Sequence, residues 1–383
     1  MSTRPAPDVL IVAGDFVLTG GMDRANYALA DYLSRGGRAV ELVAHRAAPE
    51  LLARSRVTFR RVPKPWGSYA LGEPFLDRIG RRAARRASAA GARVVVNGGN
   101  CIARGLNWVH YVHAAYTPEQ PRTAHGLRRF LGHVGALRTE RAALRAATRV
   151  VANSHATRRV LIEKLGVPEE RAVVIYYGID RTRFSTVVQG GAPAARARLG
   201  WPERPTVAFI GALGDRRKGF DTLFDAWSEL CRGSSWDADL VAIGSGADLG
   251  HFRDLARRRG LEARVRLLGF RTDVDELLGA CDALVAPTRY EAFGLGVAEA
   301  LARGLPALVS RSAGVAELYP RELEGCLLDD PESVSEIVTR LGRWRQNMDE
   351  LRTGVGPLSE RIRARGWDDM ARDLVAELDA GSL

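Results

Sequence analysis

Short apolar runs alternate with amphipathic segments along the first half of the chain. The runs occupy residues 8–13, 39–44, 93–97, 149–152 and 172–176. Between several of them the apolar positions recur at helical spacing, as they do over residues 22–34 and 139–147. Buried strands that alternate with helices are typical of a mostly parallel sheet covered by helices.

The same alternation begins again after a segment rich in turn-forming residues. Residues 180–205 contain three glycines and three prolines, a composition that indicates a break between domains. A second series of apolar runs follows at residues 206–211, 240–243, 265–268, 283–286 and 307–310. The pattern therefore predicts two doubly wound α/β domains whose ligands bind at the carboxyl ends of the strands, in a cleft between the domains.

The length of the chain agrees with this division. Its 383 residues exceed what one core holds comfortably and suit two domains. We place the first domain at residues 1–188 and the second at 189–366. The amphipathic stretch at residues 367–378 is expected to form a closing helix within a C-terminal segment of residues 367–383.

The composition is that of a soluble globular protein rather than a membrane or secreted one. Hydrophobic residues make up 46% of the chain and charged residues 26%, and no apolar run approaches the ~20 residues of a membrane-spanning helix. The N-terminus lacks the pattern of a signal peptide. The four cysteines are widely spaced, without a CxxC pair, which favours a reducing cytoplasm and no structural metal.

The positive charge is confined to the first half. Residues 1–190 contain 30 Lys and Arg against 14 Asp and Glu, whereas the remainder contains 26 against 31. Arginines gather at residues 78–86 and again from Arg122 to Arg159. This excess is typical of a solvated arginine-rich surface, of peripheral contact with an anionic membrane, or of binding to another polyanion. Nucleic acid is the least favoured partner, because no aromatic-interleaved basic platform is present.

The segment most informative about chemistry is APTRYEAFGLGVAEALARGLPALVS at residues 286–310. A strand ends at Ala286, a loop containing Glu291 follows, and a helix begins near Gly294. Unpaired N–H groups and the helix dipole attract a diphosphate to such a helix start, and glycine permits its close approach. Glu299, about a turn and a half into the helix, is placed to accept ribose hydroxyls. Glu291 would face the sugar attached to the far phosphate.

This string resembles the E-x7-E element of the retaining glycosyltransferases of family 4, the group 1 family, all of which have the GT-B fold. The resemblance extends over nearly the whole chain. It implies two Rossmann-like α/β domains facing a deep cleft, with a C-terminal helix crossing back to the N-terminal domain. It also implies that Glu299 binds the ribose and that Glu291 contacts the donor sugar. The residues that hold the phosphates by analogy are Phe293, Gly294, Leu295 and Gly296.

A basic loop after the strand at residues 206–211 is the second candidate. Its sequence GALGDRRKGF leads into a helix at Phe220. A cation in this loop would stabilise the charge that develops on the leaving diphosphate. The family has an Arg and a Lys here, both in contact with the phosphates. Lys218 matches the family Lys, but Ala212 stands at the Arg position, so Arg216 or Arg217 is expected to replace it.

Three further loops resemble donor-binding loops of the family. Gly20 and Gly21 lie in the first strand–helix turn, where the family has a glycine-rich loop facing the donor phosphates and the acceptor. Without the resemblance, a glycine pair merely permits a turn. The absence of GxGxxG argues against a dinucleotide-dependent oxidoreductase. The other two loops contain Gly244 with Gly246, and Phe270 with Arg271, which correspond to family loops near the nucleotide and its base.

Histidines in the segment WVHYVHAAY at residues 108–116 form a fourth candidate. If this segment is a strand, His110 and His113 face opposite sides, which argues against a metal pair. In the family a histidine at the end of this strand reaches the donor sugar, and His113 is the better match. The alternative is a hydrogen-bonded core histidine. Tyr116 would lie near the acceptor.

Two motifs have simpler structural interpretations. Asp273 and Asp275 spell DxD, the metal–diphosphate motif of the other glycosyltransferase fold, but acidic residues also favour a helix start, which we expect here. Asn153 and Ser154 are expected to cap a helix after a strand. We predict no metal site and no cofactor, since GT-B enzymes use helix dipoles and cations on the diphosphate.

The function implied is that of a metal-independent, retaining hexosyltransferase. The donor would be a UDP- or GDP-linked sugar and the acceptor a glycan, a lipid-linked sugar or a small molecule, as in polysaccharide or glycolipid biosynthesis. The assumed location is the cytoplasm or the inner face of the membrane. Alternatives are a GT-B sugar-nucleotide epimerase, a phosphorylase-like or glucan synthase enzyme, and a non-catalytic sugar- or membrane-binding relative. The base, sugar, acceptor, linkage and oligomeric state do not follow from the sequence.

Overall fold

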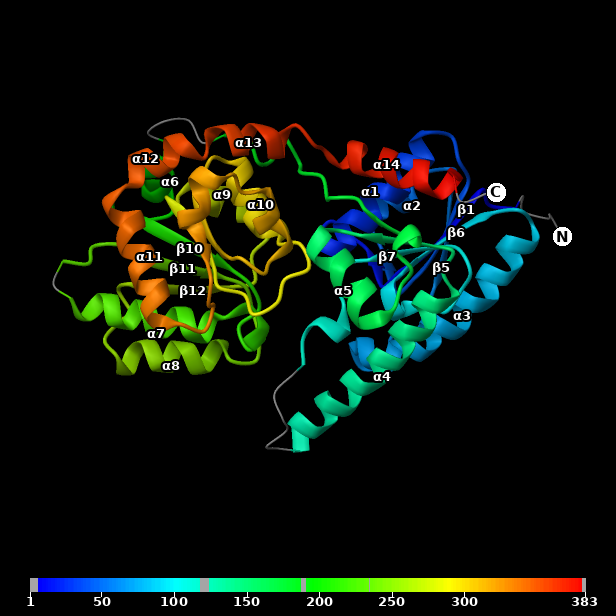
Figure 1. Ribbon diagram of the computed structural model, residues 1–383, viewed down its shortest axis with the longest axis horizontal. Helices are drawn as coiled ribbons and strands as arrows, with labels where there is room; N and C mark the ends of the chain where they lie inside the picture. Colours follow the sequence, from blue (N-terminus) through cyan, green and yellow to red (C-terminus); the bar gives the residue numbers. More distant parts are fainter. Residues whose placement is uncertain (1–5, 118–123, 187–190, 234, 381–383) are drawn as a thin grey trace. The chain divides into compact units, whose positions relative to one another are not determined.

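The computed structural model describes residues 6–117, 124–186, 191–233 and 235–380. The chain forms two compact units, shown in Figure 1. Unit 1 comprises Met1–Gly178 and Trp367–Leu383, and unit 2 comprises Ile179–Gly366. The expected domain limit between residues 188 and 189, and Arg122 of the second arginine cluster, lie outside the described residues.

Unit 1 contains a seven-stranded parallel sheet in the order β5-β3-β1-β6-β7-β8-β9. The chain crosses from one side of β1 to the other between β5 and β6, so β1 and β6 flank the topological switch point. Two short strands, β2 and β4, pair outside this sheet. The bounds are β1 (Val9–Val12), β2 (Asp15–Phe16), β3 (Val40–Ala44), β4 (Arg46–Ala47), β5 (Val57–Arg61), β6 (Arg93–Asn97), β7 (Leu106–Val109), β8 (Arg149–Ala152) and β9 (Ala172–Val174).

Helices cover the unit 1 sheet, and an apolar core separates them from it. On the face covered by α3, Leu10 and Val12 of the sheet pack with Leu76 and Ala83 of the helix. The helices are α1 (Gly21–Arg35), α2 (Pro49–Leu52), α3 (Tyr69–Ala89), α4 (Ala124–Ala146), α5 (His155–Leu165) and α14 (Trp367–Ala380), and the 3-10 turns are η1 (Pro65–Gly67), η2 (Gly98–Asn100), η3 (His113–Ala115) and η4 (Glu169–Arg171).

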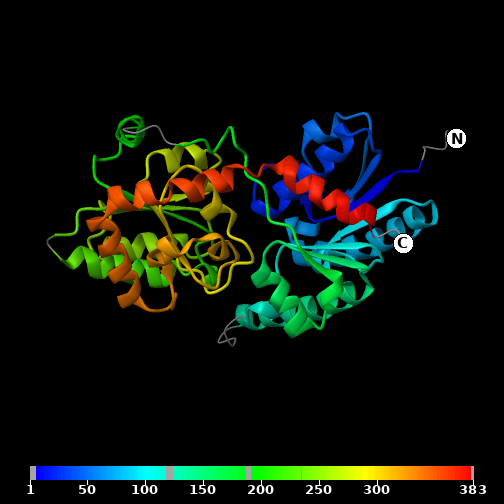
Figure 2. The same ribbon diagram turned by 45° about the horizontal axis from the view of Figure 1, so that its top comes forward.

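The C-terminal helix α14 packs against α1, the first helix of unit 1, as Figure 2 shows in red and blue. An ion pair of 2.6 Å joins Arg35 to Asp368, and another of 2.5 Å joins Arg38 to Asp379. Such exposed pairs each contribute about 0–1 kcal/mol. The buried residues of α14, which include Met370 and Leu374, therefore supply most of the attachment.

Unit 2 contains a six-stranded parallel sheet in the order β12-β11-β10-β13-β14-β15. Its strands are β10 (Thr206–Ile210), β11 (Asp239–Ile243), β12 (Val265–Gly269), β13 (Ala283–Ala286), β14 (Ala307–Ser310) and β15 (Leu327–Leu328). The chain runs outward from β10 to β12 and then returns to the other side of β10 at β13. The switch point of this sheet therefore lies between β10 and β13.

Helices lie on both faces of the unit 2 sheet (Figure 1). One face packs against α7, α8 and α11 through a core that includes Phe209, Trp227, Phe252 and Trp344. On the other face Ile243 packs with Leu277 of α9. The elements are α6 (Gly191–Arg198), η5 (Arg216–Lys218), α7 (Phe220–Arg232), α8 (Leu249–Arg258), α9 (Val274–Gly279), α10 (Leu295–Ala302), η6 (Gly314–Leu318), η7 (Arg321–Cys326), α11 (Val334–Gln346), α12 (Met348–Gly354) and α13 (Gly356–Arg363).

Two local predictions have clear outcomes. The helix cap after β8 is confirmed, because the hydroxyl of Ser154 accepts a 3.0 Å hydrogen bond from the backbone N–H of Thr157. The expectation that His110 and His113 alternate along a strand is wrong. Strand β7 ends at Val109, and the chain then turns into η3, which begins at His113.

Candidate functional site

The loops that follow β10 and β13 meet at the switch point of unit 2. The first loop ends in η5 and the second leads into α10. A backbone hydrogen bond of 2.8 Å runs from Arg289 N–H to the carbonyl oxygen of Arg217. Because both loops leave the carboxyl ends of adjacent parallel strands, side chains far apart in the sequence come together here.

Lys218 of the first loop forms an ion pair with Glu291 of the second. The Lys218 side chain is 21% exposed and that of Glu291 is 17% exposed, so the pair is largely shielded from solvent. Burial raises the pKa of Glu291, but the attraction of Lys218 and of Arg217 outweighs it and holds the pKa below its usual value. Glu291 is therefore ionised at neutral pH.

Of the two arginines considered as replacements at this site, Arg217 lies beside Glu291. Its guanidinium donates to the carbonyl oxygen of Tyr290 over 3.2 Å and pairs with Asp215 at 2.9 Å. Arg216 instead pairs with Asp221 at 3.2 Å, with its side chain half exposed. The structure therefore places Arg217, rather than Arg216, beside the Lys218–Glu291 pair.

Arg289 also belongs to this site, although no pattern in the sequence indicated it. Its side chain is only 11% exposed and pairs with Asp221 at 2.8 Å and with Glu332 at 2.8 Å. It also donates to the carbonyl oxygen of Arg216. Arg289 thus joins the second loop to the first and to the start of α7, which fixes the loop positions that Lys218 and Glu291 depend on.

Helix α10 begins at Leu295, four residues after Glu291, and a glycine stands at its start. Gly294 is the N-cap residue, with φ 104°, and no side chain caps the helix. A side chain at Gly294 would also press on Val315, whose Cγ1 would lie 3.0 Å from the added Cβ. Next to it, Phe293 is buried, while Leu295 and Gly296 are half-buried. The backbone conformation and the packing of Val315 therefore both require a glycine at the start of α10.

Glu299 lies in the second turn of α10, on the same helix whose start follows Glu291. It is 9% exposed, so most of its side chain is shielded from solvent. A carboxylate at this depth is suited to accept hydrogen bonds from two neighbouring hydroxyl groups. The ribose-binding role of Glu299 stays a prediction.

Gly244 and Gly246 support the first loop from the neighbouring strand. The N–H groups of Gly211 and Leu213 donate to this segment, at 3.0 Å to Ile243 O and 3.1 Å to Ser245 O. A Cβ on Gly244 would lie 2.0 Å from the carbonyl oxygen of Gly211, and one on Gly246 would lie 1.7 Å from that of Leu213. Both glycines are therefore required for loop packing, whether or not they also contact a nucleotide.

Phe270 and Arg271 follow β12, the edge strand two positions from β10. Phe270 is 66% exposed, so its ring is accessible for stacking. Arg271 pairs with Asp273 at 2.7 Å, and Asp275 pairs with Arg183 at 2.6 Å. Asp273 is the N-cap residue of α9 and Asp275 lies in its first turn, so the helix-start interpretation of the DxD sequence is confirmed.

In unit 1, Gly20 and Gly21 stand at the start of α1. Gly20 is the N-cap residue with φ 84°, a conformation that favours glycine. The carboxyl of Asp23 in the first turn lies 3.6 Å from the position of a Cβ on Gly20. Burial and the nearby Asp15 raise the pKa of Asp23 to about 7. The glycine loop therefore borders a carboxyl that titrates near neutral pH.

The two histidines after β7 have different surroundings. His110 is buried and its Nδ1 lies 2.5 Å from the hydroxyl of Tyr177, as a core histidine would. His113 is less buried, and burial together with His133 lowers its pKa to about 4, so its ring is neutral at pH 7. A neutral imidazole can exchange hydrogen bonds with sugar hydroxyls. This difference favours His113 over His110 as the ligand-contacting residue.

A buried carboxylate that the sequence did not suggest holds the turn of His113. Both oxygens of Glu140, on α4, accept backbone hydrogen bonds, at 2.8 Å from His113 N–H and 3.2 Å from Ala114 N–H. Glu140 is 1% exposed, and burial raises its pKa to about 7. Its place on a helix of near-uniform polarity gave no signal of this role.

Within the described residues, no group of three or more His, Cys, Asp or Glu side chains is arranged to hold a metal ion. A separate search of the same residues finds that none of the helices has both the length and the apolar character needed to cross a bilayer.

Both halves of the chain match known sequence families. The model of glycosyltransferase family 4 matches residues 19–183, and that of the glycosyl transferases group 1 matches residues 204–344. The chain is 26% identical over 244 residues to an uncharacterised glycosyltransferase of Methanocaldococcus jannaschii, covering 59% of this chain and 58% of the relative. It is 33% identical over 187 residues to a D-inositol 3-phosphate glycosyltransferase of Kineococcus radiotolerans, covering 46% and 42%. The chain spans about half the length of the curated relatives it matches.

Solved structures share the fold over nearly the full chain. WaaG, a glycosyltransferase involved in lipopolysaccharide biosynthesis, superposes with a TM-score of 0.76 at 17% identity, covering 97% of this chain and 99% of WaaG. Sucrose-phosphate synthase from Thermosynechococcus elongatus gives 0.76 at 21%, covering 98% and 99%. Anabaena HepE in complex with UDP and glucose gives 0.70 at 21%, covering 98% and 100%. The two parallel-sheet units thus have the GT-B fold.

Proposed function

Because this chain belongs to the group 1 glycosyltransferases of family 4, we propose that it moves a hexosyl unit from a nucleotide diphosphate sugar to an acceptor hydroxyl. The observation that supports this most directly is the Lys218–Glu291 ion pair beside the start of α10. A cation, an ionised carboxylate and a glycine helix start at one switch point provide for a diphosphate and an attached sugar together.

Unit 2 would bind the donor. Glu299 accepts hydrogen bonds from the ribose hydroxyls, and the N–H groups at the start of α10 bind the diphosphate. Lys218 and Arg217 neutralise the charge that grows on the leaving phosphate. The exposed ring of Phe270 is available to stack on the base. The structures of HepE with UDP and with UDP-glucose make UDP a leading candidate for the nucleotide.

The chemical step we propose proceeds with retention and without a metal ion. The bond from the anomeric carbon to the phosphate oxygen breaks, and the acceptor oxygen bonds to the same face of that carbon. The acceptor proton passes to the leaving phosphate oxygen. Glu291 orients the donor sugar, and Lys218 and Arg217 take the electrostatic role that a metal ion has in other glycosyltransferases.

The loops at the carboxyl ends of the unit 1 strands would bind the acceptor. His113 and the Gly20–Gly21 turn supply hydrogen-bonding groups there. Several relatives are named D-inositol 3-phosphate glycosyltransferases, so a polyol or sugar hydroxyl is the acceptor class we test first. A glycan or a lipid-linked acceptor presents the same nucleophile.

The test is a thermal shift screen followed by product analysis. We expect 1 mM of one nucleotide among UDP, GDP, TDP and ADP to raise the Tm by several degrees, because a ligand that binds only the folded state stabilises it. NMR of the product made from the matching donor sugar then gives the anomeric configuration. Failure of all four nucleotides to bind at millimolar concentration would overturn the proposal.

Peripheral contact with an anionic membrane is a separate part of the proposal. On α3, Arg81 pairs with Asp77 and Arg86 pairs with Glu41. The exposed arginines that remain on this helix form no ion pair with any described residue, and they are Arg78, Arg82 and Arg85.

Sedimentation with vesicles containing 30 mol% phosphatidylglycerol tests this contact. We expect binding that decreases with salt and is lost when the three free arginines of α3 are replaced by alanine. Equal recovery of the protein with neutral and anionic vesicles would contradict it.

A further inference from the structure

Three neighbouring strands of unit 1 end at one edge of its sheet, in the order β5-β3-β1. The loops after β3 and β5 enclose a pocket of about 470 Å³ that we call the cationic pocket, since Arg46, Arg61 and Lys64 line it. A second pocket of about 470 Å³ adjoins it and shares Arg46 and Arg61. Apolar side chains dominate this second pocket, which we call the apolar pocket, and they include Leu18, Pro49, Leu52 and Phe59.

The cationic pocket has more positive than negative charge. Neither Arg61 nor Lys64 forms an ion pair with a side chain in the described part of the chain. The ammonium of Lys64 lies 3.7 Å from the ring centroid of Tyr69. This cation–π contact fixes the position of the ammonium without neutralising its charge.

The third cation, Arg46, is held in place by the fold. Strands β2 and β4 pair Asp15 with Arg46 in register, and the guanidinium donates to Asp15 Oδ2 over 2.9 and 2.5 Å. Tyr69 also donates its hydroxyl to Asp15. All three of these hydrogen bonds end on Oδ2 of the buried Asp15 carboxylate. Arg46 remains 53% exposed, and its guanidinium also contacts Tyr69.

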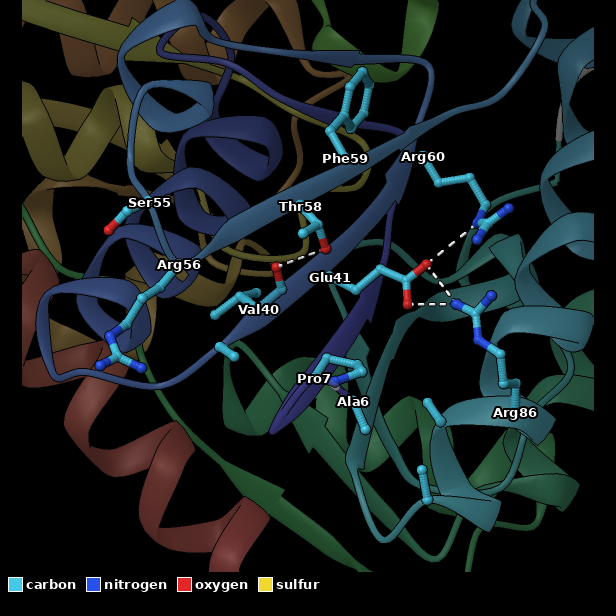
Figure 3. Close-up of a pocket in the computed structure, with 13 residues that line it drawn as sticks. Ala6, Pro7, Val40, Glu41, Ser55, Arg56, Thr58, Phe59, Arg60 and Arg86 are labelled. Atoms are coloured by element: carbon cyan, nitrogen blue, oxygen red, sulfur yellow. Dashed lines mark hydrogen bonds and ion pairs between the residues drawn. The ribbon is translucent and has the colours of Figure 1, made fainter. Parts of the chain in front are cut away.

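A larger cavity of unit 1 is also lined by arginines, but a buried carboxylate neutralises two of them. It has a volume of about 750 Å³ and is drawn in Figure 3. There the buried carboxylate of Glu41 accepts from Arg60 at 3.2 Å and from Arg86 at 2.7 Å (Figure 3). Two of its arginines therefore serve one internal carboxylate. No carboxylate serves Arg61 and Lys64 in this way among the described residues.

We propose that the cationic pocket binds a phosphate group of the acceptor. Arginine forks and the lysine ammonium match phosphate oxygens in geometry and charge. The inference rests on the proposed function and specifies its acceptor as a phosphate ester. A soluble sugar or polyol phosphate and a phospholipid head group both supply this chemistry.

The position of the pocket relative to the glycine loop supports an acceptor role. Leu18 and Thr19, which precede Gly20, line the adjoining apolar pocket. Asp23, which follows Gly21 closely, lies near enough to Lys64 and Arg46 for their charges to lower its pKa. An acceptor anchored by its phosphate in the cationic pocket would thus place its hydroxyls toward the Gly20–Gly21 turn.

The rim of the pocket offers a way to separate the two sources of phosphate. Trp66 stands between Lys64 and Gly67 and is 93% exposed. Its φ of 48° is the only positive value of a non-glycine residue in the part of the chain that the structure describes. An indole held outward in this way would enter the interfacial region of a bilayer if the phosphate belongs to a lipid.

The first test is calorimetric titration with glycerol 3-phosphate, using glycerol as the phosphate-free control. We expect binding of the phosphate only, with an affinity that falls as salt rises. Arg61→Ala and Lys64→Ala should each weaken it at least fivefold, while Arg61→Lys retains most of it. Arg56→Ala, which changes the cavity of Figure 3, should leave it unchanged. The Tm of each variant confirms folding.

Vesicles of phosphatidylcholine with 30 mol% phosphatidic acid form the second arm. A blue shift of tryptophan emission on these vesicles that Trp66→Ala removes, and that Lys64→Ala weakens, identifies the lipid source. Binding of glycerol 3-phosphate without such a shift identifies the soluble source. Binding of neither probe, or equal affinities for wild type, Arg61→Ala and Lys64→Ala, overturns the inference.

The outcome is separable from that of the proposed function. Lys64→Ala should retain the thermal shift with the donor nucleotide, because Lys64 belongs to unit 1 and the donor groups to unit 2. If no nucleotide binds to the wild type, the donor assignment fails, whereas phosphate binding at Arg61 and Lys64 remains measurable.

Discussion

The ammonium group of Lys218 pairs with the carboxylate of Glu291 across the switch point of unit 2. The two residues are 73 positions apart in the chain. Their pairing requires that β10 and β13 lie side by side and that both loops turn toward the same point. An opposite charge this close keeps Glu291 ionised despite its burial. The pair is therefore the natural place to begin testing the site.

Replacing Glu291 by alanine should lower kcat about 100-fold, because it removes an interaction that orients the reacting sugar. The donor Kd should change less than fivefold, since Glu299 and the start of α10 remain. Steady-state kinetics and calorimetry with the donor nucleotide measure the two effects. Glu262→Ala, which alters an exposed glutamate of unit 2, is the matched control. Equal losses in kcat and affinity would contradict the assigned role.

Lys218→Ala combined with Glu291→Ala tests whether the two residues act as a pair. Residues in contact show non-additive effects, typically by 0.5–3 kcal/mol. We expect the double variant to lose less activity than the two single losses added together in free energy. Strict additivity in the double-mutant cycle would show that the ion pair does not contribute to activity.

Glu299→Gln should mainly weaken donor binding. A hydrogen bond to a charged group contributes about 1.5–3 kcal/mol, so the Kd of the nucleoside diphosphate should rise roughly 10- to 100-fold. The kcat at saturating donor should stay within about threefold, because the ribose lies away from the reacting bond. Calorimetry and full kinetics with the matching donor measure both. A fall in kcat with unchanged affinity would refute the ribose assignment.

Arg217→Ala and Arg216→Ala should have unequal effects. Arg217 contacts the loop of Glu291 through Tyr290, whereas Arg216 is half exposed and pairs with Asp221. We expect Arg217→Ala to weaken diphosphate binding about tenfold and Arg216→Ala less than twofold. The two variants remove the same charge from adjacent positions, so each serves as the control for the other. The reverse order would identify Arg216 as the phosphate ligand.

Gly219→Ala should destabilise the donor loop. Gly219 has φ 72°, and an added Cβ would lie 1.8 Å from the carbonyl oxygen of Pro287. We expect the free energy of unfolding to fall by at least about 2 kcal/mol, measured by urea denaturation. Gly250→Ala is the control, because no atom lies within 4 Å of its added Cβ. A neutral effect of Gly219→Ala would mean that the two loops do not pack as described.

Glu140 should make stability depend on pH near neutrality. Burial raises its pKa from 4.5 to about 7, so the folded state binds more protons than the unfolded state between these values. The free energy of unfolding therefore falls as pH rises through this window, by about 3 kcal/mol, and levels off above it.

Glu140→Gln has no proton to lose, so it isolates this contribution. The stability of the variant relative to the wild type should improve by about 3 kcal/mol between pH 4.5 and pH 8. Urea denaturation at the two pH values measures the difference, in which the titration of the shared histidines cancels. A difference that does not change with pH would show that Glu140 titrates in its ordinary range.

Much of the architecture follows from the linear pattern of side chains. Apolar runs separated by helical segments predict two parallel sheets, since only buried strands and covering helices satisfy both patterns. The E-x7-E spacing of Glu291 and Glu299 likewise places a carboxylate on each side of a helix start. These features depend on residues close together in the chain, where local geometry is fixed by short-range rules.

Long-range pairing decided what the pattern left open. The choice of Arg217 over Arg216 depends on which guanidinium reaches Tyr290, and the sequence presents the two as equal neighbours. The roles of Arg289 and Glu140 could not be predicted from the sequence, because their partners lie far away in the chain. These partners are Asp221 for Arg289 and the turn of His113 for Glu140. The strand expected to contain both histidines ended before them, because the chain turns into η3 after β7.

The sequence by itself determined the fold class and the loops at the switch point of unit 2, and it indicated Glu291 and Glu299 as candidate site residues. Periodicity and motif spacing are properties of contiguous segments, so they can be recognised without knowledge of tertiary contacts. Only the tertiary structure decided which charges neutralise one another. Asp15 engages Arg46 and Glu41 engages Arg86, while Arg61 and Lys64 pair with no carboxylate of a described residue, because an ion pair depends on distances of a few ångströms between strands.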